Sequence, residues 1–253
     1  QISLTYRNEE DRELSLKGIF QYLESHPKKV VLAIDEFQQV REYAAVNMEA
    51  LLRSYIQSLH NVRFIFCGSK KHTMTDIFTN AKRPFYESTT FLSLNKLDIP
   101  VYKDFIQLKF REGGRQIASD DVDQIIKWTR DHTFYTQTLC NELYFNCSEE
   151  ISARDILEAE GRILAANRDR FLELQRLLTP AQWKMLTAIA KEGSVDHPTA
   201  TAFIQKYRLG SGAAVSKNIK SMVEKELILV ENDGQKVHYY VYNVFLSRFL
   251  ETL

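Results

Sequence analysis

Two adjacent carboxylates, Asp35 and Glu36, are the residues of this sequence whose types and spacing best suit chemistry. They follow the apolar run Val30–Ile34 directly. Carboxylate oxygens can hold Mg²⁺, and a second carboxylate beside the metal can polarise a water molecule for attack. The alternative is a strand that ends at a solvated acidic turn. The elements that position the two acids must decide between these interpretations.

The apolar run itself indicates how the two acids are held. Val30–Ile34 has no polar face, which is typical of a strand buried on both sides of a parallel sheet. Open α/β sheets bind ligands at the carboxyl ends of their strands. Val62–Cys67 predicts a second strand and Thr90–Leu94 a third, with segments of helical spacing between them. This alternation predicts a parallel sheet with right-handed crossovers.

Further polar side chains are predicted at the same sheet edge. Ser69 follows the second strand, where its hydroxyl could contact a phosphate or the attacking water; the alternative is an ordinary serine in a turn. Lys70, Lys71, Lys82 and Arg83 supply positive charge beyond this edge. Basic side chains in surface loops are usually only solvated.

The loop that normally cradles a nucleotide's phosphates is missing from these residues. A G-x-x-x-x-G-K-[ST] loop requires a Gly-Lys step, and none of the nine glycines precedes a lysine. We therefore expect this chain to bind ATP poorly or not at all. It also starts at Gln1 rather than at a methionine, so we expect it to begin within a longer polypeptide.

The pattern changes to helices only after Leu97. Residues 98–178 predict an all-α domain with breaks at Gly113 and Gly114. Thr179 and Pro180 then form a strong helix start, at which we place a boundary. Residues 179–253 predict three short helices and a hairpin turning at Asn232-Asp233-Gly234, which is the winged-helix arrangement. The predicted domains are 1–97, 98–178 and 179–253.

This order of elements resembles an AAA+ ATPase of the archaeal-ATPase and STAND type, a group related to the Orc1/Cdc6 initiators. The resemblance covers nearly the whole chain and implies an incomplete P-loop NTPase core, a helical lid and a winged helix. It also implies that Asp35 and Glu36 are the Walker B pair, with Asp35 on Mg²⁺, and that Ser69 is the sensor-1 residue. Arg83 lies roughly where such proteins place an arginine finger. The intact protein would then use ATP and Mg²⁺.

The resemblance also implies a missing strand. In this class the P-loop strand lies between the last strand and the sensor strand, so its removal leaves unpaired backbone groups and a gap in the core. We therefore expect residues 1–253 alone to be destabilised. An alternative function is a regulator without catalysis, whose ATPase core is only a scaffold for a winged helix that binds DNA or a protein.

Charge gives mixed support for DNA as a partner. The expected contact residues on the third helix and the wing are Ser211, Ser216, Lys217, Lys220 and Lys236. However, residues 179–253 hold nine basic and seven acidic side chains, a small excess for a fold that must neutralise several phosphates. Self-association or a protein partner are the alternatives.

Composition excludes several other classes of protein. The chain is 44% hydrophobic and 26% charged with a net charge of zero, which is typical of a globular protein. Its three cysteines form no C-x-x-C pair, which indicates a reducing compartment without a disulfide framework or a zinc site. No apolar run is long enough to span a bilayer, so we expect a cytoplasmic protein without a membrane partner.

Overall fold

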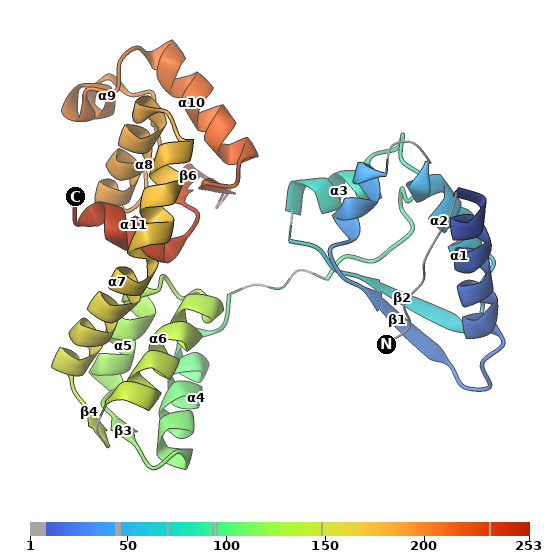
Figure 1. The fold of residues 1–253 in the computed structure, drawn as a ribbon, viewed down its shortest axis with the longest axis horizontal. Helices are drawn as coiled ribbons and strands as arrows, with labels where there is room; N and C mark the ends of the chain where they lie inside the picture. Colours follow the sequence, from blue (N-terminus) through green and yellow to red (C-terminus); the bar gives the residue numbers. More distant parts are fainter. Residues whose placement is uncertain are drawn as a thin grey trace. The chain divides into compact units, whose positions relative to one another are not determined.

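The computed structural model describes residues 9–43, 47–69, 71–92, 94, 96–147, 149–232 and 234–253; it does not describe the side chains of 9–14, 71 and 72. The chain divides into two compact units, Gln1–Leu94 (unit 1) and Asn95–Leu253 (unit 2) (Figure 1). The division falls close to the boundary predicted at residue 97. The division of the second part into two domains at 178 stays a prediction.

Unit 1 alternates helices with two parallel strands. Its elements are α1 (Glu9–Glu24), β1 (Val30–Ile34), the 3₁₀ helix η1 (Phe37–Glu42), α2 (Met48–Gln57), β2 (Val62–Phe66) and α3 (Lys71–Thr79). β1 and β2 pair in parallel with Val30 opposite Val62 and Ile34 opposite Phe66. The predicted parallel pairing of these two strands is thus confirmed, and it brings their carboxyl ends to one edge.

The predicted third strand is wrong. The described residues of the segment Thr90–Leu94 lie outside any strand, and Ser93 lies outside the described part. A strand needs a hydrogen-bonded neighbour, and this segment has none because β1 and β2 pair only with each other. The sequence resemblance places a P-loop strand next to this segment, and the absence of that strand from these residues explains why the described residues of Thr90–Leu94 form no strand.

One face of the two-stranded sheet is covered and the other is bare. Figure 1 shows the helices of unit 1 gathered on one side of β1 and β2. On that side Phe37, Ile77 and Phe85 belong to a small hydrophobic core, and Phe66 packs against it. On the other side Val31 and Ile65 are 64% and 51% exposed. A strand buried on both faces, as the sequence predicts for Val30–Ile34, is therefore found covered on one face only.

The first part of unit 2 is a bundle of four helices, here called the lid. These helices are α4 (Ile99–Glu112), α5 (Ser119–Trp128), α6 (Thr133–Asn146) and α7 (Ala153–Leu177), with a short parallel pair between β3 (Gln116–Ile117) and β4 (Glu150–Ile151). Local signals explain the helix starts: Asp98 caps α4, and Ser152 forms a capping box with Asp155 at α7. The lid is all-α apart from the small pair, as predicted.

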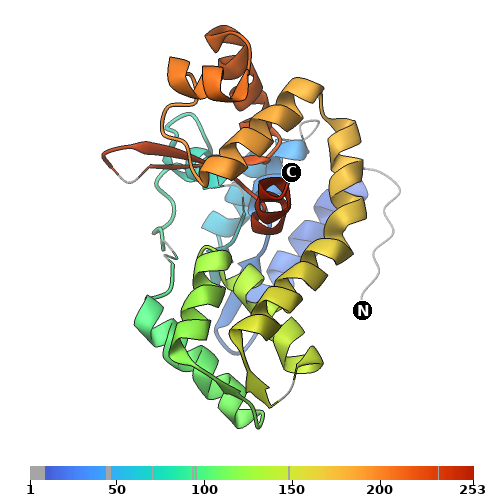
Figure 2. The ribbon, with the colours of Figure 1, turned by 90° about the vertical axis from the view of Figure 1, so that its left-hand side faces the viewer.

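The rest of unit 2 has the helices and hairpin of a winged helix. They are α8 (Pro180–Glu192), α9 (Thr201–Tyr207), α10 (Gly212–Glu224), the antiparallel strands β5 (Ile228–Asn232) and β6 (Val237–Val241), and α11 (Val244–Glu251). Thr179 and Gln182 form a capping box around Pro180, as the sequence signal at this point requires. Figure 2 shows the hairpin projecting from the helices.

The lid and the winged helix share one continuous hydrophobic core. At their contact, Arg248 on α11 donates to the carbonyls of Trp128 and Lys127 at 2.9 and 3.1 Å, at the carboxyl end of α5. Arg130 donates to the buried Ser247 hydroxyl at 2.8 Å. The Phe245 ring packs on Trp128 and Tyr135. Since a cation at a helix carboxyl end is favourable, these contacts bind the two parts firmly.

No helix in the described part of the chain combines the length and apolar character needed to cross a membrane. The cytoplasmic location stays a prediction.

Candidate functional site

The carboxylate of Glu36 and the hydroxyl of Ser69 meet at the carboxyl edge of β1 and β2. Ser69 Oγ donates to Glu36 Oε2 at 3.1 Å. Gln38 Nε2 donates to the same carboxylate oxygen and lies 3.5 Å from Ser69 Oγ. The two residues that the sequence places after neighbouring strands are therefore in direct contact, together with a third that sequence reasoning missed.

The backbone after β1 explains this contact. Glu36 lies in the left-handed region at φ 50°, which is uncommon for a residue other than glycine and favours a sharp turn. Beyond the strands the pairing continues: Cys67 N donates to Ile34 O and Phe37 N to Cys67 O, both at 2.9 Å. The turn thus holds Glu36 beside the segment that carries Ser69. Non-glycine residues in this region cluster at functional sites.

Gln38 is a buried polar residue that fixes the Glu36 carboxylate. Gln38 is only 4% exposed, and its Oε1 has no hydrogen-bond partner among the described residues. Gly68 allows its approach, because a Cβ on Gly68 would lie 2.2 Å from Gln38 Oε1. The only sequence signal for Gln38 is its position three residues after Asp35. The apolar run that predicts β1 ends before Gln38, so it could not place this side chain.

Asp35 is exposed at the same edge. Its carboxylate oxygen Oδ1 accepts from the Glu36 backbone N–H at 2.9 Å, which holds it beside the end of β1. No group of three or more His, Cys, Asp or Glu residues able to hold a metal occurs among the described residues. Mg²⁺ needs no such group, since it is usually bound by one or two carboxylates together with phosphates and waters. The donor set of Asp35, Glu36 and Ser69 therefore fits a magnesium nucleotide, while a phosphate cradle is absent from the sequence.

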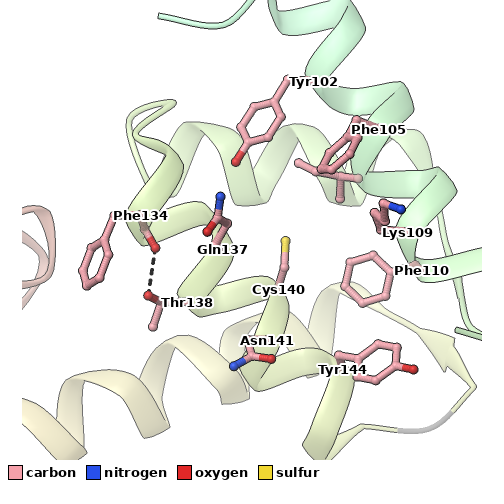
Figure 3. A pocket seen from close by; sticks show the side chains of 11 residues that line it. Tyr102, Phe105, Lys109, Phe110, Phe134, Gln137, Thr138, Cys140, Asn141 and Tyr144 are labelled. Atoms are coloured by element: carbon pink, nitrogen blue, oxygen red, sulfur yellow. Dashed lines mark hydrogen bonds between the residues drawn. The ribbon is translucent and has the colours of Figure 1, made fainter. Parts of the chain in front are cut away.

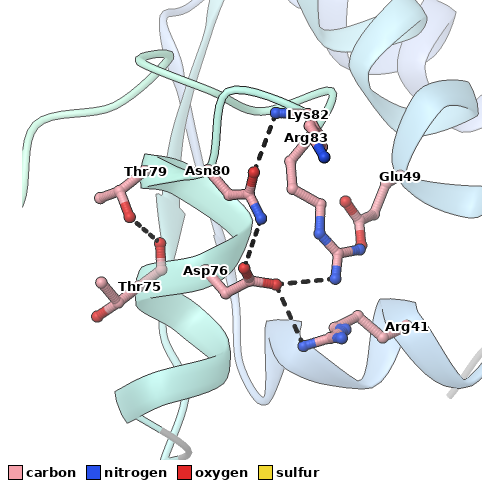
Figure 4. Close-up of polar contacts among 8 residues, drawn as sticks. All are labelled: Arg41, Glu49, Thr75, Asp76, Thr79, Asn80, Lys82 and Arg83. Atoms are coloured by element: carbon pink, nitrogen blue, oxygen red, sulfur yellow. Dashed lines mark hydrogen bonds and ion pairs between the residues drawn. The ribbon is translucent and has the colours of Figure 1, made fainter.

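Arg83 is engaged in ion pairs within unit 1 (Figure 4). Its guanidinium lies 2.8 Å from Glu49 Oε1 and 2.8 Å from Asp76 Oδ2. Asp76 also accepts from the Asn80 amide and pairs with Arg41 at 3.5 Å. The Asn80 hydrogen bond, followed by Arg83, holds the pKa of Asp76 below its usual value. The structure thus gives Arg83 internal partners, and its role as an arginine finger stays a prediction.

The lysines predicted near this edge contribute little to the described geometry. Lys70 and the side chain of Lys71 lie outside the described residues. Lys82 is exposed, and only its backbone N–H contacts the Asn80 side chain, at 3.0 Å. None of the three is shown to approach Glu36.

The predicted DNA-contacting residues are at the surface of the winged helix, but they are not equally available. Ser216, Lys217 and Lys220 are exposed on α10. Ser211 caps α10 by accepting from Ala214 N at 3.3 Å.

On the wing, Asp196 offsets the positive charge of Lys236 and contacts His238 on β6. The Lys236 ammonium lies 3.6 Å from Asp196 Oδ2, and His238 Nδ1 lies 2.6 Å from Asp196 Oδ1. The wing therefore presents less positive charge than its sequence suggests.

Comparison with known proteins tests the fold. The family described as a probable winged helix domain matches residues 169–252. Among solved structures, a Walker-type ATPase of Pyrococcus abyssi aligns with a TM-score of 0.67 and 18% identity over 98% of this chain and 72% of its own. The chain has the fold of a Walker-type ATPase. The resemblance inferred from the sequence is thereby confirmed at the level of the fold, including the winged helix at its C-terminal end.

A second solved structure, the ORC2 protein of Aeropyrum pernix in its ADPNP and ADP complexes, aligns with a TM-score of 0.45 and 11% identity over 99% of this chain and 72% of its own. A search of curated protein sequences found no match. The fold rests on the alignment with the Pyrococcus abyssi ATPase, and the roles of individual residues stay predictions.

Proposed function

We propose that this chain forms the Walker B, lid and winged-helix part of an ATPase that hydrolyses ATP with Mg²⁺. The observation that supports it best is the hydrogen bond between Glu36 and Ser69 at the carboxyl edge of β1 and β2. In such a site Asp35 would hold Mg²⁺, Glu36 would accept a proton from the attacking water, and Ser69 would orient that water or the terminal phosphate. The bound nucleotide would supply the transferred phosphoryl group and part of the metal shell.

The proposal requires a phosphate-binding loop from a segment outside these 253 residues. The bare face of the sheet and the pairing of β1 and β2 only with each other leave room for a further strand with its helix. Because the lid and the winged helix share one core, we propose that they respond to the nucleotide as one body. The ATP cycle would then move the winged helix together with the lid.

The direct test compares this chain with a longer form of the protein that carries a G-x-x-x-x-G-K-[ST] loop. We expect ATP binding and Mg²⁺-dependent phosphate release from the longer form and neither from residues 1–253 alone. Isothermal titration with ATP and a phosphate-release assay measure the two. If the sequence preceding these residues in the gene encodes no such loop, the ATPase proposal fails and the alternative of a regulator without catalysis is favoured.

A second role, DNA binding by the winged helix, is supported by the exposed Lys217 and Lys220 on α10. If both lysines contact phosphates, changing Lys217→Ala and Lys220→Ala together should weaken DNA binding uniformly across sequences. The slope of the binding constant against salt concentration, both on logarithmic scales, should fall by the contribution of about two phosphate contacts. A mobility shift at two salt concentrations measures this.

The matched control is Lys191→Ala, a change of an exposed lysine on α8. It should leave binding unchanged. If Lys191→Ala weakens binding as much as the double change on α10, the binding depends on general positive charge and not on α10. If the unchanged protein does not shift DNA even at low salt, a protein partner is favoured instead.

A further inference from the structure

A pocket of about 490 Å³ lies between α4 and α6 of the lid, away from the Glu36 site (Figure 3). Such a volume is within the range that small molecules occupy. Five of its lining residues are aromatic: Tyr102, Phe105, Phe110, Phe134 and Tyr144. Phe105 and Phe134 are exposed at the surface although they are large and apolar. Contiguous exposed apolar patches, unlike single exposed side chains, often mark ligand-binding grooves.

A buried hydroxyl without a hydrogen bond faces this pocket. Tyr102 is only 4% exposed, and its hydroxyl has no hydrogen-bond partner among the described residues. Figure 3 shows this hydroxyl directed toward Gln137 and the pocket. Burial raises the pKa of Tyr102, and the Thr136 hydroxyl, which lies nearby but beyond hydrogen-bond distance, opposes this only in part, so the phenol keeps its proton at neutral pH. A buried donor left unsatisfied is costly, and a ligand with an acceptor would remove that cost.

Apart from Lys109, the remaining polar groups of the pocket are neutral. The amides of Gln137 and Asn141 line it, and burial raises the pKa of the Cys140 thiol to about 12, so this group is uncharged. The single charged lining residue, Lys109, is paired with Glu112 at 2.7 Å. A charged ligand would therefore lose its hydration without gaining a free counter-charge.

We propose that the pocket between α4 and α6 is a binding site for a small, neutral aromatic molecule that carries a hydrogen-bond acceptor for the Tyr102 hydroxyl. The aromatic walls bury the ring, and the hydroxyl and the two amides fix its polar end. The site lies entirely in the lid, so its occupancy does not depend on the ATPase proposal.

The experiment titrates residues 1–253 with three probes and follows the backbone amide signals by NMR. Benzamide carries an aromatic ring and a carbonyl acceptor, toluene only the ring, and benzoate a charge. We expect benzamide to shift signals of α4 and α6 saturably with a Kd of roughly 1 mM or tighter. Toluene should bind more weakly, and benzoate should bind most weakly. Absence of saturable benzamide binding, or tighter binding of benzoate, overturns the proposal.

The change Tyr102→Phe tests the hydroxyl. It removes only a buried, unsatisfied group, so the fold should be retained. Benzamide binding should weaken about fivefold, as for the loss of one hydrogen bond, while toluene binding stays the same. The matched control is Tyr242→Phe, at a half-exposed tyrosine elsewhere in unit 2, which should change neither affinity. If Tyr102→Phe lowers the affinity for benzamide no more than it lowers the affinity for toluene, the Tyr102 hydroxyl does not bind the ligand.

The change Asn141→Trp tests the position. Asn141 is exposed and lines the pocket, so a bulky indole there covers the opening without altering the buried core. Binding of both benzamide and toluene should be lost. If both still bind with unchanged affinity, their site lies elsewhere and the proposal is wrong.

Discussion

Replacing Arg83 with alanine should destabilise unit 1 by about 3 kcal/mol, which is a large part of the stability of a typical domain. Glu49, only 5% exposed, would lose the guanidinium 2.8 Å from its Oε1, and its Oε2 already has no hydrogen-bond partner among the described residues. An uncompensated buried carboxylate is the costly product of such a change. Hydrogen exchange of the β2 amides reports on unit 1 separately from unit 2 and measures the loss.

Two controls separate the ion pair from general effects. Arg63 lies exposed on β2, and Arg63→Ala should change stability by less than about 0.5 kcal/mol. The double change Arg83→Met with Glu49→Met removes both charges and should recover most of the loss, because apolar replacements of a buried ion pair are often neutral. If Arg83→Ala leaves the exchange of β2 unchanged, the pairs do not hold the unit together. Arg83 would then be available for its predicted role as an arginine finger.

Replacing Glu36 with glutamine in a form of the protein that carries a phosphate-binding loop should lower ATP turnover by about 10²–10⁴-fold. The glutamine amide has the shape of the carboxylate and can still accept the hydrogen bond that Ser69 donates at 3.1 Å. It cannot accept a proton from water at neutral pH. ATP binding should therefore stay within about threefold of the unchanged protein, since only the chemical step loses a group. Phosphate release and equilibrium binding of ATP measure the two effects.

The matched control for this change is Glu42→Gln, at an exposed glutamate at the end of η1. It should leave both turnover and binding unchanged. Unchanged hydrolysis after Glu36→Gln would remove Glu36 from the role of general base. A parallel loss of binding would instead indicate that Glu36 holds the metal.

Several features of the fold could be predicted from the sequence because they depend on residues close together in the chain. Thr179 and Pro180 start α8, and the turn between Asn232 and Gly234 joins β5 and β6, as their local chemistry requires. The apolar run before Asp35 forms β1, and the second run forms β2 in parallel. Parallel pairing alone brings Glu36 and Ser69 to one edge, so the core of the candidate site could be expected without coordinates.

Other features were decided only by the tertiary structure. Gln38 contacts Ser69 because the chain turns at Glu36 and Gly68 leaves space, and neither condition can be read from a pattern of apolar residues. Arg83 pairs with Glu49, which is 34 residues away in the chain. The prediction of a third strand at Thr90–Leu94 was wrong because strand pairing depends on two segments, whereas strand propensity depends on one.

The same reason separates the two adjacent carboxylates after β1. By itself the sequence determined that Asp35 and Glu36 follow a strand. Only the packing of η1 against β2 decided that Glu36 turns toward Ser69 and Gln38 while Asp35 stays exposed. Local chemistry determines where a strand or helix begins and ends, and contacts between distant segments determine which side chains meet.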